Sequence, residues 1–325
     1  MKQRVTNFQP LGILTAKKIE SEINHFFSGA PSYNSTYKLY LFKTLLDLKD
    51  YGNFTNPNDR SWVTNAIGNA VSVDLNFLST RFVYHYWNLW FKFKLRQSPN
   101  PDPLKGVVIY GLLDAIKAKR TDEKRPNIEE LSDSSLNDLR KEVIKCIRRQ
   151  ALWKLQNDCM IYEIVDSKTI LVPMGVIEYF KGEYYVLTSA LNFQIAKFLE
   201  RINQAPKIAE KVVGVLQRTS LPDLEFDKIK RDQGFKCFYC SAKTIDAQEH
   251  VIPWNYLYDT KPFNIVGACQ SCNSAKNDSA PNKAFFDQVI VRNHRLYSNY
   301  IGYNEQLYTN IYSACIQEYN KKTWP

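Results

Sequence analysis

The chain has 325 residues, of which 44% are hydrophobic and 23% are charged, a composition typical of a folded globular protein with about two domains. No segment reaches the roughly 18 uninterrupted apolar residues of a membrane helix, and the short apolar run Leu11–Leu14 is too small for a signal peptide, so we expect a cytoplasmic protein with no membrane contact. Lys and Arg together number 43 against 33 Asp and Glu, and the resulting formal charge of +10 makes a polyanion the first partner to consider.

Apolar residues recur at helical spacing through most of the amino-terminal half. In the segment 135–156, Ser135 and Asp138 have the spacing of a weak capping box. The aromatic-rich segment 73–97 is too long for a strand, so it predicts a buried helix. The predicted helices cover residues 11–27, 35–51, 73–97, 104–118 and 135–156.

The period of the apolar residues then changes from 3.6 residues to 2 residues. Short β-branched or aromatic runs follow one another here and are separated by turn pairs such as Lys181-Gly182. These runs, at 160–165, 169–173, 175–180 and 183–187, predict a small antiparallel meander. Helical spacing returns at 191–203 and 206–216, and the proline and acids of 220–227 suggest a linker. The expected fold class is therefore α+β, with a mainly helical domain at 1–222 and a second domain at 223–325.

The seven cysteines include two CxxC pairs, Cys237 with Cys240 and Cys269 with Cys272. A reducing cytosol argues against structural disulfides, whereas two such turns supply the four thiolates of a tetrahedral zinc site. Alternatively, these cysteines are small hydrophobic residues buried in a core, or they form a redox-active pair. We therefore predict one structural Zn²⁺ held by four cysteines.

The residues around these pairs resemble those of the HNH endonuclease family. Glu249 and His250 lie between the two pairs, Asn264 precedes the second pair, Asn273 directly follows it, and Lys276 comes three residues later. The resemblance covers about fifty residues, from 237 to roughly 286. It implies a zinc-stapled ββα-metal domain that cuts phosphodiester bonds.

The same residues have the chemistry that phosphodiester hydrolysis needs. An imidazole is mostly neutral at cytosolic pH, so His250 can act as the general base that deprotonates water. Glu249 and Asn273 offer oxygen ligands to a hard Mg²⁺ or Mn²⁺ ion, and the resemblance implies the same roles. Glu249 departs from the Asp that most members carry. Adjacent strand residues face opposite sides, so Glu249 and His250 share a site only if the strand bends or ends there.

Two further side chains, those of Asn264 and Lys276, are candidates with less support from the sequence than His250. The resemblance implies that Asn264 supports the loop and helps to orient the catalytic histidine, although an asparagine at a turn is the plain alternative. Lys276 lies on about the same helical face as Asn273 and is a candidate for contacting phosphate. The alternative for Lys276 is a solvated lysine on the surface of a helix. The alternatives for His250 are a structural histidine and a zinc ligand.

A basic stripe in the amino-terminal domain is a candidate DNA-binding surface. Lys141, Lys145 and Arg148 fall on one helical face, where they are able to follow a phosphate backbone. A solvated charged helix face is the alternative, and it is the favoured one because acidic residues share the same segment.

These observations favour an HNH endonuclease that acts on DNA. The family resemblance suggests a role in restriction or phage defence, in which a homodimer or a partner protein of a defence system is conceivable. Two alternatives remain open. One is a zinc-dependent DNA-binding module without catalysis, and the other is a homing or RNA-directed HNH nuclease.

Overall fold

The computed structural model describes residues 15–28, 34–66, 68–100, 107–118, 128, 131–214, 216–242, 244–319 and 323–324. The chain divides into two compact units. The first comprises Met1–Phe91 and Arg96–Ile202, and the second comprises Lys92–Leu95 and Asn203–Pro325. The predicted boundary at 222/223 falls within the second unit, at the start of a helix rather than in a linker.

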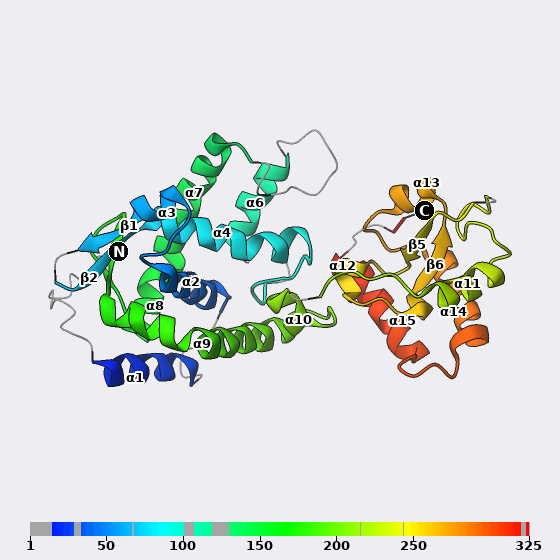
Figure 1. The fold of residues 1–325 in the computed structure, drawn as a ribbon. Helices are drawn as coiled ribbons and strands as arrows, with labels where there is room; N and C mark the ends of the chain where they lie inside the picture. Colours follow the sequence, from blue (N-terminus) through cyan, green and yellow to red (C-terminus); the bar gives the residue numbers. More distant parts are fainter. Residues whose placement is uncertain are drawn as a thin grey trace. The chain divides into compact units, whose positions relative to one another are not determined.

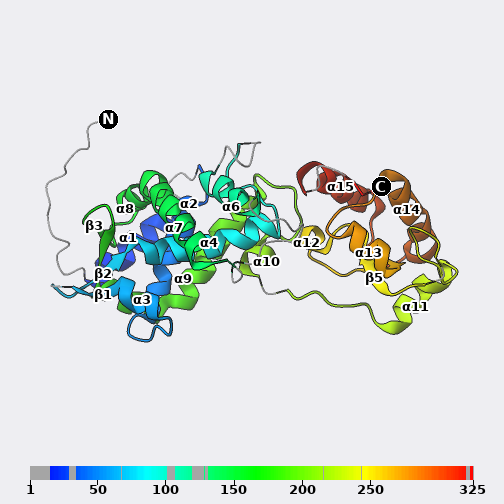
Figure 2. The ribbon, with the colours of Figure 1, turned by 90° about the horizontal axis from the view of Figure 1, so that it is seen from above.

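Helices make up most of the first unit (Figures 1 and 2). They pack through large aromatic and aliphatic side chains, and the rings of Phe26 and Phe42 stack with their centroids 4.9 Å apart. The elements are α1 (Ala16–Phe27), α2 (Tyr37–Leu46), the 3₁₀ turn η1 (Asp47–Asp50), α3 (Pro57–Trp62), α4 (Leu75–Phe91), α6 (Val108–Ala118), α7 (Asp133–Ile147), the π-helical turn η3 (Arg148–Leu152), α8 (Trp153–Asp158) and α9 (Met174–Glu200).

One small antiparallel sheet accompanies these helices, in the strand order β1-β2-β4-β3. Val71 pairs with Val172 and Val73 with Ile170, and all four side chains are buried, as expected for strands with one face on a core. The strands are β1 (Val63–Ala66), β2 (Ala70–Asp74), β3 (Glu163–Ile164) and β4 (Thr169–Pro173). Helices with small antiparallel sheets confirm the α+β prediction.

The predicted four-run meander is wrong in its second half. Only β3 and β4 form, and the runs at 175–180 and 183–187 belong to the long helix α9. Ile177, Phe180 and Leu187 have the spacing of one helix face and are buried, while α1 and α2 both pack on α9 (Figure 1). Apolar residues on the other face of α9 obscured this period in the sequence.

α7 begins earlier than predicted. Ser132 is the N-cap, because its hydroxyl accepts a hydrogen bond from the backbone N–H of Ser135 at 3.3 Å. The capping box expected at Ser135 is therefore wrong. For the helices expected at 11–27 and 104–118, residues 11–14 and 104–106 lie outside the described residues, and the remainder forms α1 and α6.

The second unit contains a two-stranded antiparallel sheet surrounded by short helices. Its interior includes the stacked rings of Phe286 and Tyr312, whose centroids lie 3.7 Å apart. Its elements are α10 (Ile208–Val213), α11 (Asp223–Asp232), β5 (Ala247–His250), α12 (Trp254–Leu257), the 3₁₀ turn η4 (Pro262–Asn264), β6 (Ile265–Ala268), α13 (Gln270–Lys276), α14 (Lys283–Tyr297), α15 (Glu305–Ala314) and the π-helical turn η5 (Cys315–Tyr319).

A buried arginine joins this sheet to α14. Arg292 is 3% exposed, and its guanidinium donates hydrogen bonds to the carbonyl oxygens of Ile265 and Phe263. The neighbouring Asn293 also donates to the carbonyl of Phe263, at 2.9 Å. These bonds satisfy backbone groups at the start of β6 that burial would otherwise leave without partners.

Among the described residues, no helix combines the length and the apolar character that a bilayer crossing requires.

Candidate metal centre and adjoining histidine pocket

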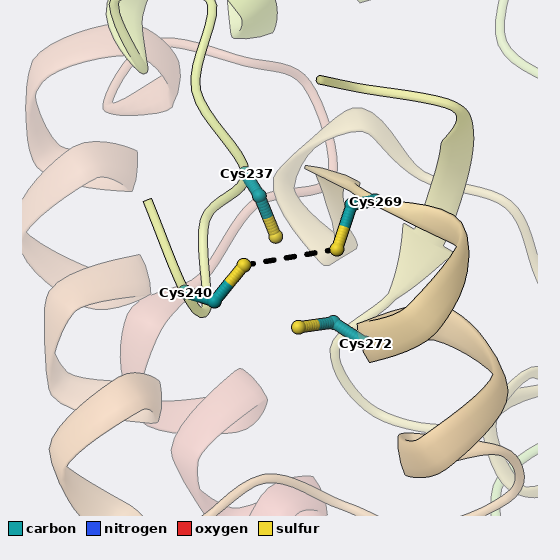
Figure 3. Close-up of side chains that lie close together, drawn as sticks. All are labelled: Cys237, Cys240, Cys269 and Cys272. Carbon is teal, nitrogen blue, oxygen red and sulfur yellow. Dashed lines mark hydrogen bonds between the residues drawn. The ribbon is translucent and has the colours of Figure 1, made fainter. Parts of the chain in front are cut away.

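The four paired cysteines come together at one point of the second unit (Figure 3). Their sulfur atoms all lie within 4.8 Å of one another, and the Sγ atoms of Cys240 and Cys269 are 3.7 Å apart. A tetrahedral ion with metal–sulfur bonds of about 2.3 Å places its sulfur ligands about 3.8 Å apart. The cluster could therefore hold a metal such as zinc, as the two CxxC pairs predict.

Backbone hydrogen bonds hold the first cysteine pair in place. The N–H of Cys237 donates to the carbonyl of Ala242 at 2.8 Å, and the N–H of Phe238 donates to the carbonyl of Gly267 in β6 at 2.9 Å. A Cβ at Gly267 would approach Ile245 to 2.9 Å, so only glycine fits this close packing. The turn is thus fastened to the same strand that leads to the second pair.

The local fold also prepares one of the sulfur atoms, that of Cys237, for a metal. Burial acts to raise the pKa of Cys237, but backbone N–H groups of Cys240, Cys269 and Tyr239 outweigh it and lower that pKa to about 7. Cys269 is the N-cap of α13, and Cys272 lies in its first turn. A thiolate is the form that binds a metal, so the surroundings of Cys237 favour metal binding. Burial raises the pKa of Cys272, and the pKa of Cys240 is also raised, so these two thiols would lose their protons to the metal as it binds.

His250 and Asn273 both line one pocket, although they come from different elements. His250 is the last residue of β5, and Asn273 lies in α13 directly after the last cysteine. The pocket has a volume of about 470 Å³ and is also lined by Arg218, Thr219, Ser220, Phe226, Ile245, Asp246, Ala247 and Gln248. The structure thus brings the predicted base and the predicted amide ligand to one cavity.

The hydrogen bonds of His250 determine which ring nitrogen carries the proton. Arg218 Nη2 lies 3.1 Å from Nδ1, and a guanidinium can only donate, so Nδ1 is an acceptor. The other nitrogen, Nε2, lies 3.3 Å from the hydroxyl oxygen of Thr260, and this hydroxyl donates to the carbonyl of Thr219 at 3.0 Å. Nε2 therefore carries the proton, and Nδ1 is the nitrogen able to accept another.

The pKa of His250 favours this neutral form. Burial is the main cause, and the positive charges of Arg218 and Lys276 add to it, so the pKa falls to about 3. His250 is 3% exposed. The imidazole is consequently uncharged across the physiological pH range.

The strand geometry separates Glu249 from His250. β5 remains paired with β6 through His250, opposite Ile265, so the two adjacent side chains face opposite sides of the sheet. Glu249 is not among the described residues that line the pocket. Its Oε1 instead accepts a hydrogen bond from Lys276 Nζ at 2.7 Å, and burial raises its pKa although Lys276 opposes this effect.

Lys276 occupies a position unlike the one that the sequence predicts. Its side chain is fully buried, and Nζ also donates to the carbonyl of His250 at 2.7 Å. A phosphate contact needs an accessible ammonium, so the predicted contact does not fit this place in the fold. Lys276 instead links α13 to the end of β5.

Asn264 holds the loop that follows β5. Its Oδ1 accepts hydrogen bonds from the N–H of Ile252 at 2.9 Å and from the hydroxyl of Tyr308 at 2.7 Å, and its Nδ2 donates to the carbonyl of Ile252 at 2.9 Å. The residue is fully buried. This arrangement fits the predicted role in supporting the loop next to His250.

The basic stripe of the first unit is exposed but largely paired. Lys141 contacts Asp138 at 3.1 Å and Lys145 contacts Glu142 at 2.6 Å, while Arg148 is exposed at the end of α7. These neighbouring acids reduce the positive potential of the stripe.

Sequence reasoning missed Arg218, Thr260 and Gln248. Gln248 shares the strand face of His250, and it both accepts from and donates to the backbone of Leu221, at 2.7 and 3.2 Å. These bonds fasten the segment that carries Arg218 over the histidine. The sequence holds no signal for this contact, because it joins segments that only the fold places together.

Comparison with known proteins found no match. No family model, no curated protein and no solved structure matches the chain.

Proposed function

We propose that this chain is a metal-dependent DNA endonuclease of the HNH type, in which the second unit hydrolyses phosphodiester bonds. The observation that carries the proposal is the shared pocket of His250 and Asn273, next to the four-cysteine cluster. The antiparallel strands β5 and β6 are followed by α13, with α12 and η4 in the connection between the strands, and this order is compatible with the arrangement that the motif resemblance implies.

In this mechanism His250 takes a proton from the attacking water. The imidazole is neutral, and Nδ1 is its accepting nitrogen, but with a pKa of about 3 it is a weak base in the free protein. A phosphate that enters the pocket brings negative charge, which raises this pKa and makes the imidazole a better proton acceptor. Arg218 occupies Nδ1 in the structure, but a phosphate is a stronger partner for a guanidinium, with which it forms charge-assisted and bidentate hydrogen bonds. Substrate binding therefore draws Arg218 onto the phosphate and frees Nδ1 for water.

A zinc ion in the cysteine cluster would fix the end of β6 relative to α13, and so hold Asn273 beside the pocket. Within the described chain the side-chain amide of Asn273 has no hydrogen-bond partner, so its oxygen is available to a hard ion. Asn273 would offer its amide oxygen to a Mg²⁺ or Mn²⁺ ion in the pocket, which supplies positive charge to the phosphate. Glu249 faces the other side of β5 and is paired with Lys276, so it would join Asn273 on the ion only if the end of the strand turned and released Lys276.

DNA is the proposed substrate because the chain carries a formal charge of +10. The first unit would then recognise DNA or a partner, with Lys141, Lys145 and Arg148 as candidate phosphate contacts. A role in restriction or phage defence rests on the motif resemblance alone.

A cleavage assay on plasmid DNA with Mg²⁺ or Mn²⁺ tests this proposal. His250→Ala should reduce cleavage by at least about 10²- to 10⁴-fold, the usual cost of losing a positioned base, with metal content and DNA affinity unchanged. The matched control is His294→Ala, because His294 is 63% exposed on α14 and should leave cleavage unchanged. Near-normal cutting by His250→Ala would refute the mechanism.

Three further variants separate the remaining roles. Asn273→Ala and Glu249→Ala should also impair cleavage, and added Mn²⁺ should restore part of it, because both side chains act by holding the ion. Arg218→Lys should retain more activity than Arg218→Ala, since an ammonium still attracts phosphate. Equal loss in both Arg218 variants, with no change in KM, would exclude the phosphate contact.

One observation favours a second candidate, a zinc-dependent DNA-binding module without catalysis. Arg218 occupies Nδ1 of His250 and Lys276 neutralises Glu249, so both side chains already have structural partners. Wild-type protein that binds DNA but leaves it intact at every Mg²⁺ and Mn²⁺ concentration would support this alternative.

A further inference from the structure

The longest helix of the first unit, α9, is apolar on two opposite faces. One face, with Phe180, Leu191 and Ile195, is fully buried in the unit. The other face carries Tyr185, Val186 and Phe193, which are 83%, 65% and 64% exposed. A surface helix normally presents polar residues on its outer side, so this exposed stripe indicates an interaction site.

Small residues lie within the same stripe. Gly182 and Ser189 are exposed and share the helix face of Val186 and Phe193, and Ala190 is half-buried beside Ser189. Small side chains at a crossing point allow two helix axes to approach closely. The stripe can therefore accommodate another helix.

Two opposite charges flank the stripe at equal distances from its centre. Glu183 lies seven residues before Ala190 and Lys197 lies seven residues after it, which is about two helical turns in each direction. Both side chains are exposed on one flank of the stripe, and within the described chain neither forms an ion pair. Charges arranged in this way are complementary to a second, antiparallel copy of the same helix.

We infer that α9 is the interface of a homodimer, in which two copies of the helix pack antiparallel and cross near Ser189 and Ala190. Val186 of one copy then faces Phe193 of the other, and Glu183 faces Lys197. Because the two protomers are related by a two-fold axis, each of these contacts occurs twice. The flank of one helix that carries Glu183 and Lys197 lies against the same flank of its partner. One helix from each protomer makes a modest interface, so dimerisation is concentration-dependent.

Sedimentation equilibrium of the full-length protein tests the interface. The wild-type mass should shift from monomer to dimer as concentration rises, and Phe193→Glu should remain monomeric with an unchanged melting temperature, since this side chain is exposed. The matched control is Leu224→Glu, which alters a 79% exposed apolar residue of α11 and should dimerise normally. A monomeric wild type, or a Phe193→Glu dimer, would overturn the inference.

Charge reversal tests the antiparallel arrangement independently. Glu183→Lys and Lys197→Glu should each weaken dimerisation by about tenfold, because two surface ion pairs become repulsive. The double variant should recover the wild-type affinity. A mixture of the two single variants should form a heterodimer, since the lysine introduced in one protomer then faces the glutamate introduced in the other, and the unchanged Lys197 and Glu183 also face each other. If the double variant does not recover the wild-type affinity and the two single variants do not form a heterodimer, this antiparallel pairing of the helices is excluded.

Discussion

The two units differ in what fills their interiors. The first is packed with large apolar rings and aliphatic chains, and Asp59 is its one buried charged side chain among the described residues. The second has a two-stranded sheet and a four-cysteine cluster, and it buries Lys211, Glu249, Lys276 and Arg292. Apolar burial stabilises the first unit, whereas a metal in the cysteine cluster and the hydrogen bonds of the buried charges would carry more of the stability of the second. The two units should therefore fail under different perturbations.

Loss of the metal should have the largest effect, and only in the second unit. Cys272→Ser, or a strong chelator, should abolish the unfolding transition of this unit and leave that of the first in place, because a structural Zn²⁺ contributes about 10 kcal/mol or more to the folding of a small domain. A metal assay measures the bound metal, and a thermal melt measures the unfolding transition of each unit. Cys146→Ala removes a buried cysteine of the first unit and serves as the control. An intact second transition in metal-free protein would contradict the role assigned to the cluster.

Breaking the buried ion pair should have the next largest effect. Lys276→Met leaves the Glu249 carboxylate buried without its cation and should lower the free energy of unfolding of the second unit by about 3–5 kcal/mol. Adding Glu249→Gln should recover much of this loss. Lys283→Met removes an exposed pair with Asp287 and should cost about 1 kcal/mol or less. Urea unfolding measures the free energy of unfolding of each variant. A similar loss in Lys276→Met and Lys283→Met would show that the buried ion pair contributes no more than the exposed one.

An apolar truncation should affect the first unit alone. Leu78 is fully buried in α4, and Leu78→Ala should lower the free energy of unfolding of this unit by about 2–5 kcal/mol while metal content stays constant. Tyr84→Ala changes a residue of the same helix that is 48% exposed, and it should have a smaller effect. A shift of the second transition in Leu78→Ala would mean that the two units unfold together.

The smallest effect, for a change of one pH unit, concerns the response of the second unit to acid. The folded-state pKa of His250 is lowered to about 3, against about 6.5 in an unfolded chain, so its contribution to stability is complete above pH 6.5 and is lost as the pH falls toward 3. Over this range the free energy of unfolding should fall by about 1.4 kcal/mol per pH unit for this one proton. His250→Gln should remove that part of the slope, and the exposed His294→Gln should not. Parallel curves for His250→Gln and wild type would show that the histidine is not held neutral.

Much of the helical framework was predictable because its periodicity is local. α1, α2, α4 and α6 appear where apolar residues recur at helical spacing. The error at α9 has a physical cause. Tyr185 and Val186 on its exposed face broke the amphipathic pattern, and Lys181-Gly182 has the composition of a turn. Packing on α1 and α2 overrides these local signals.

The sequence by itself determined the four-cysteine cluster and the candidate pair of His250 and Asn273. A CxxC turn brings two thiolates together within a few residues, and the second pair leads directly into the helix that carries Asn273. Only the tertiary structure decided the partners of these side chains. Strand alternation turned Glu249 toward α13, where the buried Lys276 donates to that carboxylate and to the carbonyl of His250. Arg218 reaches His250 because Gln248 fastens a distant segment to the strand, and sequence spacing holds no record of such a contact.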